Sequence, residues 1–318
     1  MTEDRSEAEV ARSNEIGATV VGRSAFSVVV PTRDRPGMLS GCLRALRDDL
    51  GSGDEIVVVD SASADPATVA RLARECRARL VRLDRPGASA ARNAGWRAVT
   101  HEIVGFVDDD VRVTSGWADA VVAAFTDDDV DFVTGGVGLP AHQLNAERPV
   151  AVTSRTVRQA LHPGLDGDLG ASANLAVRRS ALVAVDGFDE RLGPGTWAAS
   201  AEDLDLLDRM FSAGLRGVYE PAAWVEHEQW RTRRQLVALD WGYGKGMGVR
   251  LARLARADPP RSRRLLRESV VEQGLQPMLR DLRHGYEFGA LTVGTRTLAT
   301  VLGRLVGAMS RSRKRHQL

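Results

Sequence analysis

Two short stretches of this sequence each contain three consecutive aspartates. One is FVDDDV, which contains Asp108, Asp109 and Asp110, and the other is FTDDDV, which contains residues 127–129. Clustered carboxylates can coordinate a divalent cation such as Mg²⁺ or Mn²⁺, and such a cation can neutralise the charge of a diphosphate. Three aspartates can also form a solvated turn without a chemical role. The residues around each triplet decide between these interpretations.

The first triplet directly follows the apolar segment EIVGFVD, which is typical of a buried strand. Ligands of open α/β sheets bind at the carboxyl ends of such strands, so this position favours a functional site. The second triplet follows WADAVVAAF, in which Trp117, Val121, Ala124 and Phe125 share one face of a predicted helix. Because a helix C-terminus disfavours negative charge, we interpret residues 127–129 as a solvated link to the next strand.

Other polar residues also follow predicted strands. Thr32 and Arg33 come after FSVVV and Pro31, where a hydroxyl, backbone N–H groups and a guanidinium can bind the oxygens of a nucleotide. Asp60 ends EIVVVD, and a carboxylate there can accept the N–H of a uracil-like base. The sequence also allows Asp60 to be a turn residue and Arg33 to be a surface arginine.

A sheet has to position these side chains, and the apolar pattern predicts one. The predicted strands cover residues 26–30, 55–60, 79–83, 102–108 and 131–137. The predicted helices between them cover residues 37–50, 67–78, 88–99 and 117–125. Strands that alternate with helices predict an α/β fold with a mostly parallel, Rossmann-like sheet flanked by helices.

The composition indicates a globular protein with an uneven distribution of charge. Of the 318 residues, 43% are hydrophobic and 27% are charged, and the formal net charge is +1. Residues 230–318 nevertheless contain 19 Lys and Arg against 6 Asp and Glu. This basic part predicts an anionic partner. We expect no nucleic acid, because no recognised nucleic-acid motif accompanies the arginines. Two roles remain open for the basic helices: peripheral contact with a membrane through residues 289–318, or packing on the rest of the protein or on a dimer partner.

We divide the chain into three parts. Residues 1–24 are polar and acidic, so we expect a disordered segment without a secretory signal. Residues 25–230 should form the α/β domain that carries the candidate site residues, and residues 231–318 a basic, helical C-terminal extension. No segment is long and apolar enough to predict a membrane span. The two cysteines, Cys42 and Cys76, fit buried thiols in a reducing cytoplasm better than a disulfide.

Six motifs in this order resemble the family 2 glycosyltransferases, which have a GT-A fold and use nucleotide-sugar donors. They are FSVVVPTRDRP, VVVDSASAD, RPGASAARNAG, FVDDDV, GASANLAVRR and AEDLDLLDRM. Each motif alone is weak, but six in this order and spacing are specific. The resemblance covers roughly residues 26–227, about two thirds of the chain.

The resemblance implies which residues bind the donor and a metal ion. It implies nucleotide-sugar contacts by Pro31, Thr32, Arg33, Asp60, Arg92, Asn93, Asp108, Asp109 and Asn174. Asp110 should be a direct ligand of Mn²⁺ or Mg²⁺, and Asp108 should bind the ribose or reach the metal through water. His227, in WVEHEQW, is expected to complete the metal site, with Glu226 or Glu228 as alternatives. Packing or surface roles remain open for Arg92, Asn93, Asn174 and His227.

The resemblance also implies the catalytic groups. Asp203, in AEDLDLLDRM, corresponds to the general base that takes the proton of the acceptor hydroxyl, and Glu202 is expected to position either Asp203 or the acceptor. We expect capping or surface roles for Asp205 and Asp208. Acids are also favoured at a helix N-terminus for structural reasons alone. Trp197 is expected either to stack on an acceptor sugar or to belong to the core.

These inferences predict an inverting glycosyltransferase that moves a single sugar from a nucleoside-diphosphate sugar to a hydroxyl acceptor. The stretch EQWRTRRQ differs from the Gln-x-x-Arg-Trp motif of the family's processive members, which favours single-sugar transfer. Two other functions remain open: a nucleotidyltransferase that makes sugar nucleotides, and an inactive protein that binds them. An oligomer is possible, and the sequence identifies neither the sugar nor the acceptor.

Overall fold

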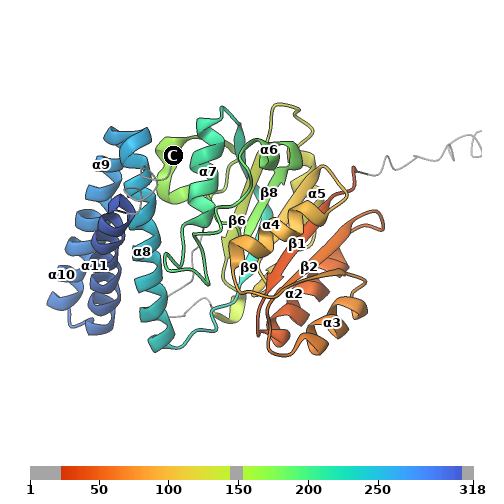
Figure 1. Ribbon diagram of the computed structural model, residues 1–318, viewed down its shortest axis with the longest axis horizontal. Coiled ribbons are helices and arrows are strands. Elements are labelled where there is room, and N and C mark those ends of the chain that lie inside the picture. The colour runs from red at the N-terminus through yellow and green to blue at the C-terminus, as the bar shows by residue number, and fades with distance from the viewer. Residues whose placement is uncertain (1–22, 144–152, 310–318) are drawn as a thin grey trace, which may run out of the picture.

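A mixed sheet forms the centre of this computed structural model, which describes residues 23–143 and 153–309 (Figure 1). Its strands are β1 (Ser27–Thr32), β2 (Glu55–Ser61), β3 (Arg79–Leu83), β4 (Ile103–Val107), β5 (Val111–Val113), β6 (Phe132–Gly138), β7 (Gln159–Leu161), β8 (Asn174–Arg178) and β9 (Gly217–His227). The order across the sheet is β3-β2-β1-β4-β8-β6-β9-β5, and β7 pairs with β9. The predicted disorder of residues 1–24 falls almost entirely outside the described residues.

The first half of the sheet is parallel and the second half is mixed. Strands β3, β2, β1 and β4 run in parallel, whereas β8 is antiparallel to both of its neighbours, β4 and β6. Strand β9 is parallel to β6, and β5 and β7 are antiparallel to β9. The five strands predicted from the sequence are present within two residues at each end, and the predicted α/β fold is confirmed.

Helices cover both faces of the sheet and extend beyond it. Those within the first two thirds of the chain are α2 (Pro36–Asp49), α3 (Pro66–Glu75), α4 (Ala88–Ala98), α5 (Trp117–Ala124), α6 (Arg179–Ala184) and α7 (Glu202–Ser212), with short 3₁₀ helices η1 (Ala141–Gln143) and η2 (Pro163–Asp168). The C-terminal ones are α8 (Arg233–Ala257), α9 (Pro259–Arg267), the π-helix η3 (Glu268–Leu275), α10 (Gln276–Arg283) and α11 (Glu287–Met309).

Strand β1 shows how the apolar pattern builds the two layers of the core. Its side chains alternate between the faces of the sheet, as strand geometry requires. Val28 and Val30 join the core under α2, α3 and α5, whereas Val29 joins the core under α4, α6 and α7. Because both faces are covered, the strand is apolar throughout. The cysteines Cys42 and Cys76 are free and buried, which confirms the prediction of thiols.

Helices α8 to α11 form a further layer at one side of the sheet (left in Figure 1). Helix α8 packs closely against both α11 and the loop that precedes α7. A Cβ at Gly246 would overlap Ser200 Oγ, and a Cβ at Gly248 would overlap the carbonyl of Thr300. Glycine is therefore required at both positions. No helix in the described ranges meets the length and apolarity needed to cross a bilayer.

Buried ion pairs fix α8 and α9 to α7. Arg250 of α8 donates two hydrogen bonds to Asp208 of α7, at 2.7 and 3.0 Å, and Arg261 of α9 donates a third at 2.8 Å. The side chain of Arg250 is almost completely buried. Two charges in such a place stabilise the fold only while they remain paired.

We predict that Arg250→Met destabilises the protein by about 3 kcal/mol, because it leaves the buried Asp208 with one arginine fewer. Urea unfolding measures this loss. The matched control is Arg71→Met, which removes the ion pair with Glu75, where both side chains are 54% exposed. That pair should contribute less than about 0.5 kcal/mol. Equal effects of the two substitutions would contradict the structural role of Arg250.

Candidate active site

Three neighbouring strands deliver polar residues to one edge of the sheet. Strand β1 lies between β2 and β4, and all three run in parallel. Their carboxyl ends therefore meet at the same edge, where Thr32 ends β1, Asp60 lies near the end of β2, and residues 108–110 follow β4. The second triplet, residues 127–129, is exposed between α5 and β6, which confirms that it is a solvated link.

Asp109 is the most enclosed acid of the first triplet, with an exposed fraction of 0%. It accepts a hydrogen bond of 2.7 Å from the hydroxyl of Thr32 and forms an ion pair of 2.6 Å with Arg35. Burial raises the pKa of Asp109 to about 7, although the charge of Arg35 opposes this shift. Asp109 therefore holds the loop between β1 and α2 in place from a buried position.

Asp110 contacts residues of the loop before α2, the end of β9 and the loop that follows β9. It accepts hydrogen bonds of 2.9 Å from Arg35 Nη1 and from Trp230 Nε1, and its Oδ1 lies 3.2 Å from His227 Nε2. Burial alone would raise the pKa of Asp110. The contacts with His227, Arg35 and Trp230 outweigh burial and hold the pKa below its ordinary value. Asp110 is thus an ionised carboxylate at the end of β4.

Arg92 connects the triplet to the acids of α7. Its guanidinium lies 2.7 Å from Asp108 Oδ1 and 3.1 Å from Glu202 Oε1, and its side chain is 3% exposed. Burial alone would lower the pKa of Arg92, but the two carboxylates raise it above its ordinary value. A buried arginine between two acids from different elements fixes the distance between them.

Glu202 begins α7 and faces this arginine from a buried position. Burial, followed by the charge of Asp203, raises the pKa of Glu202 to about 7, although Arg92 opposes the shift. Asp203, the next residue, is half-buried. Its carboxylate accepts hydrogen bonds from the backbone N–H of Leu204 at 2.8 Å and of Ser172 at 3.4 Å. Asp203 is therefore held between α7 and the Gly/Ala-rich segment that precedes β8.

The donor set near Asp110 suits a hard divalent cation. His227 Nε2 is buried and makes no hydrogen bond, although it lies beside an ionised carboxylate oxygen. Mg²⁺ and similar ions are often bound by one or two protein ligands together with the phosphate oxygens of a substrate. Within residues 23–143 and 153–309, no three His, Cys, Asp or Glu side chains form a preformed metal site. Asp110 and His227 therefore fit a metal that is completed by substrate.

The predicted base-reading residue Asp60 has polar partners of its own. Its carboxylate is fully buried, accepts a hydrogen bond of 2.9 Å from the N–H of Ser63, and pairs with Arg82. The side chain of Arg82 is 40% exposed. A nucleotide base that contacts Asp60 would therefore have to displace Arg82.

Pro31 is buried in β1, and Arg33 points to solvent, where its side chain is 50% exposed beside Asp34.

Asn93 and Asn174 lie inside the protein, each with both ends of its amide engaged. Asn93 binds the backbone of Phe188 twice, at 2.8 and 2.9 Å, and also contacts Glu190 and Trp96. Asn174 accepts from Trp117 Nε1 at 2.9 Å and donates to the carbonyls of Gly136 and Ala223 at 2.9 and 2.7 Å. Both amides thus bind the protein's own groups, and their predicted contacts with a ligand stay a prediction.

Trp197 lies in the loop formed by residues 185–201, and α8 supports this loop. The indole is 49% exposed, so Trp197 is not a core residue. Lys245 Nζ lies 5.1 Å above the centre of its ring and donates to its carbonyl at 2.6 Å. Ser200 donates at 3.1 Å to the carbonyl of Gly242. The position leaves Trp197 available to stack on a ligand, which stays a prediction.

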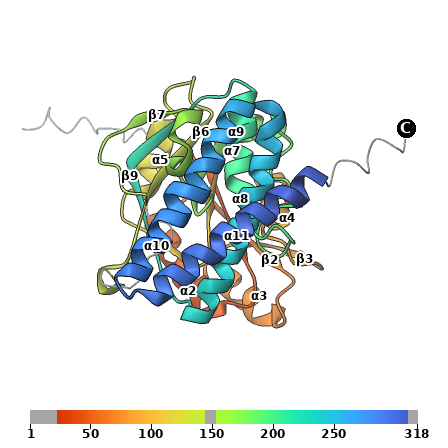
Figure 2. The ribbon, with the colours of Figure 1, turned by 90° about the vertical axis from the view of Figure 1, so that its left-hand side faces the viewer.

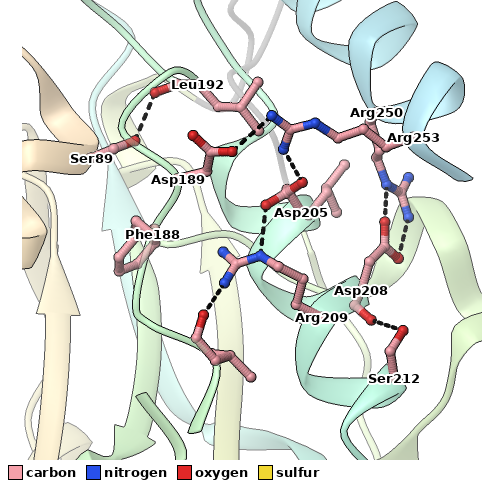
Figure 3. Close-up of polar contacts among 12 residues, drawn as sticks. Ser89, Phe188, Asp189, Leu192, Asp205, Asp208, Arg209, Ser212, Arg250 and Arg253 are labelled. Atoms are coloured by element: carbon pink, nitrogen blue, oxygen red, sulfur yellow. Dashed lines mark hydrogen bonds and ion pairs between the residues drawn. The ribbon is translucent and has the colours of Figure 1, made fainter. Parts of the chain in front are cut away.

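The surface or capping roles predicted for Asp205 and Asp208 are wrong. Asp205 is 6% exposed and Asp208 is 9% exposed, because helix α8 covers this side of α7. Figure 3 shows Arg253 between Asp189 and Asp205, and Arg250 against Asp208. These pairs connect the C-terminal helices to the 185–201 loop and to the helix that carries Asp203.

Sequence reasoning missed three residues at the triplet: Arg35, Trp230 and Arg231. Arg231 Nη2 lies 3.6 Å from Asp110 Oδ2, and its guanidinium lies 4.5 Å from the centre of the Trp230 ring. Arg35 follows Arg33 by two residues in the same charged loop. Nothing in the letters PTRDRP indicates which arginine turns inward, because the answer depends on the path of the backbone into α2.

Comparison with known proteins identifies the class of enzyme. Residues 27–181 match the family described as glycosyl transferase family 2. Two proteins described as pre-mycofactocin glycosyltransferase, both from Mycobacterium tuberculosis strains, are each 32% identical to this chain over 233 residues. The match covers 69% of this chain and 46% of each relative, so the chain spans about half the length of the curated relatives it matches.

Solved structures agree in fold. A mannosyltransferase from Pyrobaculum calidifontis, in complex with GDP-Man and Mn²⁺, has a TM-score of 0.57 at 20% identity and covers 92% of this chain and 88% of its own. S. aureus TarS 1-349 in complex with UDP has a TM-score of 0.53 at 17% identity and covers 92% of both chains.

The fold is therefore GT-A, and the chain belongs to glycosyl transferase family 2. Membership of this family favours the predicted glycosyl transfer over the transfer of a nucleotidyl group.

We predict that Glu202→Gln stabilises the protein at pH 8 and has little effect at pH 5. The folded protein raises the pKa of Glu202 to about 7. The protonated carboxyl therefore contributes its full share to the free energy of unfolding only below the pKa that Glu202 has in the unfolded chain. That contribution is lost as the pH rises through 7, by about 3 kcal/mol at most. Urea unfolding across this range measures it. A difference in the free energy of unfolding between the wild type and Glu202→Gln that does not change with pH would contradict the raised pKa.

Proposed function

We propose that this enzyme is an inverting, metal-dependent transferase that moves one sugar from a nucleoside-diphosphate sugar to an acceptor hydroxyl. The observation that carries the proposal is the bridge from Asp108 through Arg92 to Glu202. It joins the strand-end acids, where a donor nucleotide would bind, to the first turn of α7, where a base would act. Such a connection suits a reaction between two bound substrates.

The donor would bind along the edge formed by β1, β2 and β4. Asp60 would contact the base, Thr32 and Asp108 the nucleoside, and the inward-turned Arg35 the diphosphate. A guanidinium suits phosphate oxygens because it donates in a planar fork. The neighbours solved with GDP-Man and with UDP support a nucleotide-sugar donor for this chain.

Asp110 and His227 would hold Mn²⁺ or Mg²⁺. When bound, the cation would neutralise the charge that develops on the leaving diphosphate. The chain's own contribution is to keep Asp110 ionised and the imidazole of His227 turned toward it. The Mn²⁺ in the Pyrobaculum mannosyltransferase complex supports divalent metal use here.

Asp203 would take the proton of the acceptor hydroxyl as that oxygen attacks the sugar from the face opposite the leaving group. The N–H groups of Leu204 and Ser172 orient its carboxylate. Glu202, held by Arg92, would position the acceptor or Asp203. One inversion follows from one direct displacement. The exposed Trp197 would stack on the acceptor, and the name of the mycobacterial relatives makes pre-mycofactocin one acceptor to test.

The proposal includes a cytoplasmic location and the division of the chain at residue 230. The two buried free thiols support a reducing compartment. Residues 231–309 are almost entirely helical, which supports a C-terminal extension as a separate structural layer.

We predict that Asp110→Ala lowers metal-dependent donor turnover at least about 100-fold, because it removes the proposed metal ligand. Asp128→Ala, in the exposed second triplet, is the matched control and should leave turnover unchanged. Release of nucleoside diphosphate from a panel of nucleotide sugars with Mn²⁺ measures both. Equal sensitivity of the two triplets would show that the strand-end position does not select the functional acids.

We further predict that Asp203→Asn lowers the rate of sugar transfer about 10²- to 10⁴-fold and retains donor binding, because the amide keeps the shape of the side chain but cannot act as a base. Calorimetry with the donor and Mn²⁺ tests binding, and NMR of the product tests its anomeric configuration. Near-normal transfer by the variant would reject Asp203 as the base. A product with retained configuration would reject inversion for the wild-type enzyme.

A further inference from the structure

The C-terminal helices carry most of the exposed apolar surface. Of the fourteen exposed large hydrophobic residues among those the structure describes, ten lie between residues 275 and 309. They are Leu275, Leu279, Leu282, Tyr286, Leu291, Leu298, Val301, Leu302, Leu305 and Met309. Single exposed apolar side chains are ordinary, but a concentration of this kind marks a surface that binds something.

The outer face of α11 is apolar without interruption over its last three turns. Every exposed residue between 297 and 309 is apolar: Leu298, Val301, Leu302, Leu305, Ala308 and Met309. The opposite face packs on α8, where a Cβ at Gly303 would overlap the backbone of Lys245. A helix at the surface of a globular protein normally shows polar residues to water. The outer face of α11 therefore looks like one that is covered in the working protein.

A second stripe lies beside it. Leu275, Leu279 and Leu282 are spaced by four and three residues, so they share one face where η3 continues into α10, and Tyr286 is exposed in the turn before α11. Figure 2 shows α10 and α11 together on the side of the molecule that faces away from the sheet. We call the exposed apolar residues of η3, α10 and α11 the outer apolar face.

Basic residues accompany the outer apolar face. Arg280 and Arg283 lie in the last turn of α10, and the side chain of Arg280 is 69% exposed. In the sequence, Met309 is followed by SRSRKRHQL, which contains four basic residues and no acidic one. Residues 276–318 contain eight Lys and Arg against two Asp and Glu. Apolar residues flanked by cations are the combination that binds anionic lipid surfaces.

We propose that the outer apolar face is a docking surface for an anionic lipid bilayer, with α10 and α11 lying in the plane of the interface. Leucines would enter the acyl boundary while the arginines contact phosphate head groups. A second copy of the chain is the less suitable occupant, because its own arginines would face those of the first. This inference is independent of the proposed function, since it needs neither a sugar nor a metal.

Cosedimentation with phosphatidylcholine vesicles, with and without phosphatidylglycerol, tests the proposal on the full-length protein. We expect binding only to the vesicles that contain phosphatidylglycerol, and binding that weakens as salt is added. The variant Leu298→Glu/Leu305→Glu should lower the binding constant at least about tenfold. The two leucines are 63% and 59% exposed, so their replacement should leave the fold intact, which circular dichroism checks.

The matched control is Val157→Glu/Val183→Glu, which adds the same charge at residues that are 68% and 64% exposed on the catalytic part. It should bind vesicles as the wild type does. Equal loss of binding in both variants would show that the effect is one of net charge and would overturn the proposal. Equal binding to neutral vesicles would do the same. A dimer by light scattering that Leu298→Glu/Leu305→Glu converts to a monomer, without vesicle binding, would assign the face to a second copy.

Discussion

One buried guanidinium organises the site. Arg92 lies between Asp108, at the end of β4, and Glu202, at the start of α7, and both contacts are within hydrogen-bonding distance. A buried charge is tolerated only when it is paired, so β4, α4 and α7 have to meet at these atoms for the fold to be stable. The same requirement brings the acids that follow β4 and the acids at the start of α7 together in the candidate active site.

The C-terminal helices extend this principle to the 185–201 loop. Arg253 pairs with Asp189 in the loop and with Asp205 in α7, and Arg250 pairs with Asp208 (Figure 3). These elements lie outside or at the border of the segment that matches the family, which ends at residue 181. The layer formed by α8 to α11 therefore supports α7 and the 185–201 loop, while its outer surface stays apolar and basic.

Much of the fold could be predicted from the sequence because the signals are local. Apolar runs such as FSVVV bury both faces of a strand, and a polar residue directly after such a run has to lie at the edge of the sheet. This reasoning correctly separated residues 108–110 from residues 127–129. That His227 lies near Asp110 was implied by the family resemblance and not by this reasoning, and the structure places Nε2 of His227 at 3.2 Å from Oδ1 of Asp110. The reasoning from local signals gave no indication that β8 inserts antiparallel between β4 and β6.

The sequence by itself determined the strands, the helices and the acids at the strand ends, since hydrophobic periodicity is read along the chain. Only the tertiary structure decided which partners those acids have. Arg35 rather than Arg33 turns to the triplet, and Asp205 and Asp208 are buried because α8 covers them. Asn93 and Asn174 bind the protein's own backbone. The physical reason is that burial and pairing depend on segments that lie far apart in the sequence, and no local pattern specifies which of them pack together.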